Sequence, residues 1–198
     1  MIREFHLADV LTLGNAASGF AAILFIMLYM DSQSPAHFFA AAAMTPVAFA
    51  FDWLDGRVAR WRRQHSALGR ELDSLADIIS FGVAPAVLGF AAGLRGGWDW
   101  VALMYFICCG VSRLARYNVT AETLSKGQDR VAYFEGTPIP TTILLTGVLA
   151  LAAWHGRLGE NLWWGAWTIG PGDLHPLSLL FVLSGTLMIS KTLHIPKV

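Results

Sequence analysis

The chain has 198 residues, of which 55% are apolar and 14% are charged, and its formal net charge is zero. Soluble domains carry about 25% charged residues, so this composition indicates that lipid is the main solvent of the folded chain. A zero net charge provides no positive field for nucleic acid, and no nucleic-acid partner is expected. The adjacent Cys108 and Cys109 give neither a disulfide framework nor a metal-ligand spacing.

Six apolar segments are each about long enough to cross a bilayer as a helix, which takes roughly 20 residues. In chain order they cover residues 13–30, 38–61, 72–94, 98–116, 138–154 and 177–193. Residues 1–9 mix polar and apolar positions, and a short interfacial helix is expected there. The sequence therefore predicts an all-α integral membrane protein of six transmembrane helices in a single domain, residues 1–198.

The basic residues divide unevenly between the two predicted sides of the membrane. Two of them, Arg95 and Arg157, fall on one side, together with most of the tryptophans. Twelve fall on the other: Arg3, Arg57, Arg60, Arg62, Arg63, Arg70, Arg113, Arg116, Lys126, Arg130, Lys191 and Lys197. Cytoplasmic loops carry the excess of Lys and Arg. Both termini are therefore expected on the cytoplasmic side, and the tryptophans fit an interfacial belt on the opposite side.

An acidic motif links the second and third predicted segments. It reads Asp52-x2-Asp55-Gly56-x2-Ala59-Arg60-x8-Gly69-x3-Asp73-x3-Asp77. Residues three or four apart lie on one face of a helix, so each aspartate pair shares a face. A hairpin between the two segments would bring the pairs together at the cytoplasmic end.

Four clustered carboxylates repel one another and are costly in a membrane, at about 2.5–3.5 kcal/mol each at a helix centre. Two divalent cations would neutralise them, and such a pair of metals suits in-line displacement at phosphorus. The small residues Gly56 and Ala59 would let a bulky group such as a nucleotide approach the backbone. The alternative from another class is a cation or proton transporter. The aspartates gather at one interface, and no matching polar residues continue across the other half of the third and fourth segments, which favours phosphoryl chemistry.

The motif resembles the signature of the CDP-alcohol phosphatidyltransferases, membrane enzymes that move a phosphatidyl group from a CDP-linked lipid to an alcohol and release CMP. Every signature position is filled. The resemblance implies that Asp52, Asp55, Asp73 and Asp77 bind two Mg²⁺ or Mn²⁺ ions, with Asp77 also serving as general base. It implies a CDP pocket lined by five further residues: Asn15, Gly56, Ala59, Arg60 and Ser66.

Secondary patterns are similar to the phosphatidylserine synthase branch of that family. They cover residues 72–86, 113–118 and 134–140, together with Asn15 and Gly19. The resemblance implies transfer from CDP-diacylglycerol to L-serine. Thr137 departs from the pattern of the branch, and the alternative is a sister transferase that uses glycerol 3-phosphate, inositol, inositol phosphate or choline.

A serine acceptor needs a fixed cation for its carboxylate. Arg113 and Arg116 lie three residues apart at the cytoplasmic end of the fourth segment, where a bidentate contact suits that task, and Asn118 would add a hydrogen bond. The alternative is that both arginines reach toward lipid headgroups. The resemblance further implies a homodimer in a bacterial cytoplasmic membrane, surrounded by membrane lipid, with its active site facing the cytoplasm.

Overall fold

A computed structural model describes residues 7–62, 67–125, 133–192 and 194–196 of the chain. The α-helices in this part of the chain are α1 (Leu7–Ser32), α2 (Pro35–Arg62), α3 (Ala67–Asp77), α4 (Ala84–Ala92), α5 (Gly97–Ser125), α6 (Ile143–Trp154) and α7 (Ser178–Ile189). The interfacial helix expected over residues 1–9 falls largely outside the described residues.

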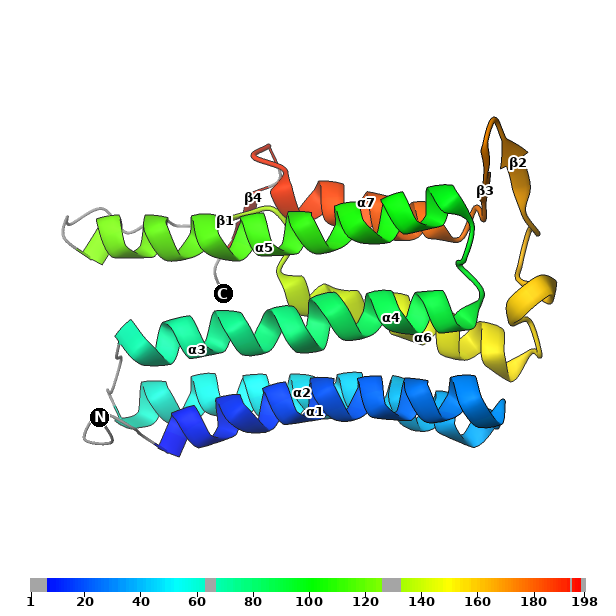
Figure 1. Ribbon diagram of the computed structural model, residues 1–198. Coiled ribbons are helices and arrows are strands. Elements are labelled where there is room, and N and C mark those ends of the chain that lie inside the picture. The colour runs from blue at the N-terminus through cyan, green and yellow to red at the C-terminus, as the bar shows by residue number, and fades with distance from the viewer. Residues whose placement is uncertain (1–6, 63–66, 126–132, 193, 197–198) are drawn as a thin grey trace.

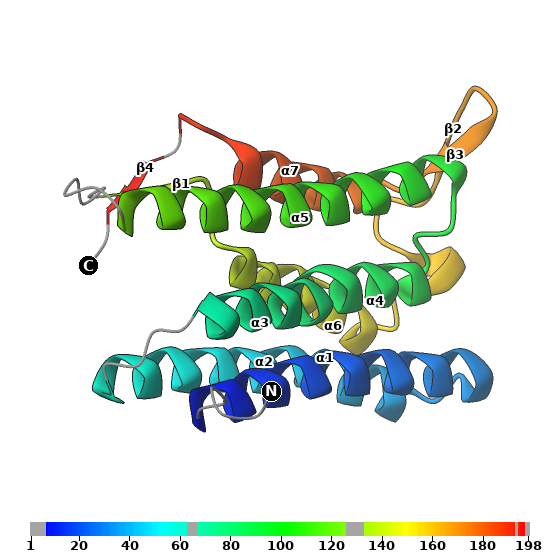
Figure 2. The same ribbon diagram turned by 60° about the vertical axis from the view of Figure 1, so that its left-hand side comes forward.

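The helices run along a common axis in three layers (Figures 1 and 2). Helices α1 and α2 form one layer, α3, α4 and α6 the middle one, and α5 and α7 the third. At one end of the bundle α2 ends, α3 begins and α5 ends; we call it the motif end. We call the opposite end, where α1 ends and α5 begins, the hairpin end. This arrangement brings the two halves of the acidic motif to one end of the molecule.

A π-helix, η1 (Ile78–Val83), joins α3 to α4 without a break, so that the middle layer contains one continuous rod. π-Helical turns are rare in proteins overall, and those that occur are often found at functional sites. Here the π-helix begins directly after Asp77. The third predicted segment, 72–94, corresponds to this rod, although the sequence did not indicate the π-helix.

Short strands depart from the all-α expectation. Strands β1 (Tyr133–Glu135) and β4 (His194–Pro196) pair in antiparallel fashion beside the second half of α5. At the hairpin end, β2 (Trp167–Ile169) and β3 (Gly172–Leu174) form a second antiparallel pair. Two 3₁₀ turns, η2 (Ile139–Thr142) before α6 and η3 (Gly159–Asn161) after it, complete the described elements. The fold is therefore mainly helical, with two small sheets.

In the part of the chain that the structure describes, three stretches are long and apolar enough to cross a membrane: Leu7–Ser32, Pro35–Trp61 and Leu68–Ala92. Ile139–Trp154 and Ser178–Ile189 are shorter apolar helices. The count of six membrane spans and the cytoplasmic orientation of the termini stay predictions. Helix α5 occupies the position of the fourth predicted span, but its second half carries the charged Arg113 and Arg116.

The distribution of side chains is that of a membrane protein. On α1 the large apolar side chains of Phe20 and Met27 are 57% and 61% exposed, whereas Asn15 is fully buried. Because exposed apolar surface is favourable in lipid and polar groups are not, this arrangement suits a bilayer. Aromatic contacts fill the interior; the rings of Phe106 on α5 and Phe181 on α7 meet edge to face with centroids 5.3 Å apart.

A buried carboxylate fixes the hairpin end. Asp99, in the first turn of α5, is 0% exposed. It accepts hydrogen bonds from the backbone N–H groups of Gly96 and His175, at 2.9 and 2.8 Å, and its Oδ2 lies 2.6 Å from the His175 ring Nδ1. Trp98 donates its indole N–H to the carbonyl of Ile169 at 2.8 Å. These contacts tie the start of α5 to the β2–β3 hairpin and to the segment that leads into α7.

Candidate metal centre

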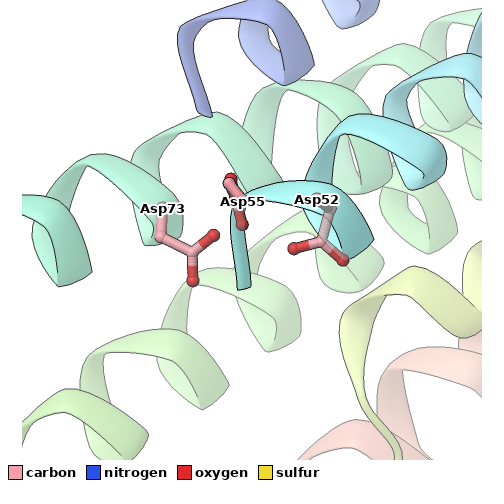
Figure 3. A group of neighbouring side chains, drawn as sticks. All are labelled: Asp52, Asp55 and Asp73. Atoms are coloured by element: carbon pink, nitrogen blue, oxygen red, sulfur yellow. The ribbon is translucent and has the colours of Figure 1, made fainter. Parts of the chain in front are cut away.

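Three aspartates from two helices meet at the motif end (Figure 3). Asp52 and Asp55 lie on α2 and Asp73 lies on α3, and one carboxylate oxygen of each falls within 4.8 Å of the others. Asp55 is buried and the other two are half-buried. The spacing of the motif predicted this convergence, because a hairpin between the two helices places both pairs at one end. We call these three residues the acidic group.

Asp77 lies beside the acidic group but not in it. It is the last residue of α3, is 6% exposed, and interacts electrostatically with Asp52, Asp55 and Asp73. Asn15 of α1 donates its amide N–H to Asp77 Oδ1 at 3.0 Å. The structure therefore assembles the four aspartates of the motif, with α1 contributing a donor to the fourth.

The surroundings of the acidic group fit divalent cations. Among ion pairs between two described residues, none joins an arginine or lysine to any of the four aspartates. The Oδ1 atoms of Asp73 and Asn15 are buried and have no hydrogen-bond partner. Oxygen atoms that only accept are the ligands that Mg²⁺ and Mn²⁺ prefer. A cation would compensate these unpaired acceptors and the mutual repulsion of the carboxylates.

Close packing fixes α1 against the middle layer next to this site. A Cβ atom on Gly19 would lie 2.7 Å from Ser80 Cα and 2.9 Å from Ser80 N, in the π-helix. The Ser80 hydroxyl donates to the carbonyl of Asn15 at 2.8 Å. Only glycine permits such a close approach of two backbones. This contact determines where Asn15 stands relative to Asp77.

The residues expected around the nucleotide follow the first aspartate pair along α2. Among the described residues, a Cβ on Gly56 would have only the Arg60 guanidinium within 4 Å, at 3.8 and 3.9 Å, so these residues leave open space beside this glycine. Ala59 is half-buried and Arg60 is exposed. Ser66 lies outside the described residues. Asn15, assigned to the same pocket, contacts Asp77 as described above.

The structure separates the residues expected at the acceptor site. Arg113 is 9% exposed, interacts electrostatically with Asp77, and has a buried Nε without a hydrogen-bond partner. Arg116 instead donates from Nη2 to the carbonyl of Ile189, the last residue of α7, at 3.3 Å. Asn118 hydrogen-bonds to Ser74 at 3.0 Å and to Glu71 at 3.3 Å, both on α3. Arg113 therefore interacts with Asp77, whereas Arg116 reaches α7 and Asn118 contacts α3.

Thr12 is a site residue that the sequence reasoning missed. Its hydroxyl lies 2.7 Å from Asp55 Oδ2, and the residue is 4% exposed. The available signal was its spacing: Thr12 stands three residues before Asn15, hence on the same helix face. The signal is weak because threonine hydroxyls in membrane helices commonly bond their own backbone.

Comparison with known proteins agrees with this geometry. The profile of the family described as CDP-alcohol phosphatidyltransferase matches residues 5–171. CDP-diacylglycerol--serine O-phosphatidyltransferase of Saccharomyces cerevisiae is 42% identical over 205 residues, covering 100% of this chain and 72% of the yeast protein. The protein of the same name from Mycobacterium bovis is 34% identical over 164 residues, covering 81% of this chain and 54% of its own length.

An archaeal relative is similar as well. Archaetidylserine synthase of Methanothermobacter thermautotrophicus is 34% identical over 157 residues, which is 77% of this chain and 60% of the archaeal protein. This chain thus spans little more than half of the mycobacterial and archaeal relatives and almost three quarters of the yeast one. The filled motif, the assembled aspartates and the match over residues 5–171 agree: the chain belongs to the CDP-alcohol phosphatidyltransferase family.

Proposed function

We propose that this protein transfers the phosphatidyl group of CDP-diacylglycerol to L-serine, giving phosphatidylserine and CMP. The observation that carries the reaction type is the assembly of four aspartates at the motif end, beside open space at Gly56. The choice of serine is supported by the names of the yeast and mycobacterial relatives, which specify serine as acceptor.

Asp52, Asp55, Asp73 and Asp77 would hold two divalent cations, Mg²⁺ or Mn²⁺. When bound, these cations would neutralise the carboxylates and stabilise the negative charge on the transferring phosphate and on the departing CMP. The protein prepares this site by keeping basic side chains out of ion-pair distance of the four carboxylates, as far as the described residues extend.

Asp77 would act as the general base. Asn15 occupies Asp77 Oδ1, so the other oxygen is the one that would receive the proton of the serine hydroxyl. As that proton moves, the serine oxygen forms a bond to the lipid-bearing phosphorus. The bond from this phosphorus to the bridging oxygen breaks, and CMP leaves with the electron pair. General-base assistance of this kind contributes about 10²–10⁴-fold to a rate.

Arg113 would bind the carboxylate of serine. Its side chain is buried, its Nε has no partner, and it lies close enough to Asp77 to interact with it electrostatically. A serine held by Arg113 would present its hydroxyl toward Asp77, and a charge-assisted contact suits this recognition. Arg116 and Asn118, which contact α7 and α3, would support the acceptor site by holding α5 in place.

The CDP group would lie along α2 beyond the first aspartate pair. Gly56 and Ala59 would leave room for it, while Arg60 and Ser66 would contact its phosphates or ribose. The open space beside Gly56 and the exposure of Arg60 support this placement. Gly56→Leu should therefore weaken the binding of CDP-diacylglycerol more than it lowers the thermal stability of the protein.

The proposed setting is a bacterial cytoplasmic membrane, with six spans and the motif end facing the cytoplasm. The excess of arginine and lysine expected at that end supports the orientation. A homodimer is proposed from the family resemblance. The tails of CDP-diacylglycerol would enter the site from the surrounding lipid.

The test is release of CMP from CDP-diacylglycerol by detergent-purified protein with Mn²⁺ or Mg²⁺. Separate reactions would contain L-serine, glycerol 3-phosphate, inositol, inositol phosphate or choline. We expect release with serine alone and its loss when a chelator removes the metal. Release with another of these alcohols, and none with serine, would contradict the assignment of serine as acceptor without contradicting the proposed metal site. Release that persists in excess chelator would overturn the metal site.

A further inference from the structure

The Thr12 hydroxyl joins the first helix to a carboxylate of the acidic group. Oγ1 of Thr12 lies 2.7 Å from Asp55 Oδ2 and 3.1 Å from the carbonyl oxygen of Ala8, one turn earlier in α1. A hydroxyl has a single proton to donate. Because a bond to an ionised acceptor is shorter and stronger than one to a neutral carbonyl, the proton goes to Asp55. The contact is buried, with Thr12 at 4% and Asp55 at 6% exposure.

The position of Thr12 is fixed by packing on both sides of α1. A Cβ on Gly14 would lie 3.0 Å from the ring of Phe51 on α2, and one on Gly19 would lie 2.7 Å from Ser80 Cα in the π-helix. The contact at Gly14 fixes the position of α1 along α2, which carries Asp55. The contact at Gly19 fixes its position along the rod that carries Asp73 and Asp77. Sliding α1 along its axis would bring a residue with a side chain to the place where Gly19 meets Ser80, and this disfavours movement of Thr12.

We infer that Thr12 is a positioning residue for Asp55, and that its hydroxyl sets the affinity of the acidic group for a divalent cation. This inference rests on the proposed metal site. The hydrogen bond from Thr12 to Oδ2 restricts rotation of the Asp55 carboxylate, which has an oxygen within 4.8 Å of those of Asp52 and Asp73. Partners that orient metal-binding carboxylates in this way commonly change metal affinity by 10–100-fold. Asn15 makes the matching contact to Asp77 Oδ1 at 3.0 Å.

A purely structural role for this hydroxyl predicts a different behaviour. If the bond to Ala8 were the one that mattered, Thr12 would be one of many membrane-helix threonines that satisfy themselves on their own backbone. Thr146 is such a residue: it is 2% exposed, and its hydroxyl donates to the carbonyl of Ile143 at 2.9 Å. It lies on α6 and provides a matched control.

The experiment measures the dissociation constant of Mn²⁺ for the full chain in detergent by electron paramagnetic resonance, with the metal alone as probe. The variants are Thr12→Val, which keeps the shape and removes the hydroxyl, Thr12→Ser, which keeps the hydroxyl, and Thr146→Val. Thermal unfolding in chelator reports whether each variant is folded. Should Thr12→Val fail to fold, Thr12→Ala takes its place.

We expect the dissociation constant to rise about tenfold or more in Thr12→Val and to stay within about threefold of wild type in Thr12→Ser and Thr146→Val. An unchanged constant in Thr12→Val would overturn the positioning role, as would an equal rise in Thr12→Ser. Wild-type protein that binds no Mn²⁺ would overturn the metal site itself, and the inference with it. The two failures are therefore distinguishable without an activity assay.

Discussion

Buried aspartates stand at both ends of this molecule, and their surroundings are opposite. At the hairpin end, Asp99 is completely buried, and two backbone N–H groups and the ring of His175 surround its oxygens. At the motif end, four aspartates lie close together, and Asp73 Oδ1 is buried without a partner. A carboxylate whose acceptors are satisfied stabilises a fold, whereas a buried carboxylate oxygen without a partner is costly unless a ligand compensates it.

This difference means that equivalent substitutions should have opposite consequences at the two ends. Neutralising an aspartate at the motif end should impair chemistry and leave the fold intact or more stable. Neutralising Asp99 should weaken the fold and leave the chemistry of the folded molecules unchanged. These opposite effects are expected if stability is given up at the proposed metal site.

The largest expected effect is on turnover. Asp77→Asn should lower the rate of CMP release by about 10²–10⁴-fold, because the amide cannot accept the proton of the serine hydroxyl. Binding of CDP-diacylglycerol, measured by equilibrium binding in detergent, should remain detectable. A variant that turns over at near the wild-type rate would remove Asp77 from the role of general base.

The next effect distinguishes the two arginines of α5. Arg113→Gln should raise the KM for serine by about tenfold or more, since a hydrogen bond to a charged group is worth about 1.5–3 kcal/mol. Arg116→Gln, which loses a contact to the Ile189 carbonyl, should change this KM by less than about threefold. Initial rates at varied serine concentration would measure both. A larger rise in this KM for Arg116→Gln than for Arg113→Gln would assign the binding of serine to Arg116 instead.

At the hairpin end, Asp99→Asn should lower stability by about 1–3 kcal/mol, because one oxygen that accepts hydrogen bonds is replaced by a donor that faces buried donors. Thermal unfolding in detergent would show a lower midpoint, with unchanged turnover per folded molecule. Asp173→Asn is the matched control, because Asp173 is exposed and hydrogen-bonds only to the nearby Thr168 within the described contacts. Equal stability of the two variants would contradict the structural role of Asp99.

The smallest expected effect is a gain in thermal stability, opposite to the loss expected for Asp99→Asn. Asp73→Asn should raise the unfolding midpoint of the metal-free protein by a few degrees or less, because it removes one negative charge from a group without basic partners among the described residues. Thermal unfolding in detergent, with a chelator present, would measure it. A clear fall in the midpoint would mean that Asp73 stabilises the fold.

Much of the fold was predictable because membrane helices are encoded locally. Five of the predicted segments overlap α1, α2, the α3–α4 rod, α6 and α7, and the remaining one, the fourth, overlaps α5. The π-helix and the two small sheets were not predicted. A π-helix of six residues leaves the apolar run unchanged, and strands of three residues lie below what periodicity can indicate.

The acidic group was predictable for a similar reason: residues three and four apart share a helix face, and a hairpin joins the two faces. The partners of these residues were not, since they depend on how separate helices pack. Asn15 was assigned to the nucleotide pocket, and in the structure its side chain donates a hydrogen bond to Asp77. Arg113 and Arg116 share a face of α5, but one lies near α3 and the other reaches α7, and spacing cannot distinguish the two.

The most direct test of the contrast between the two ends is the number of Mn²⁺ ions bound per chain, measured on wild-type, Asp73→Asn and Asp99→Asn protein in detergent. The account predicts two ions for the wild type, at most one for Asp73→Asn, and two for folded Asp99→Asn. Equal binding by wild type and Asp73→Asn, or no bound ion in any of the three, would contradict it.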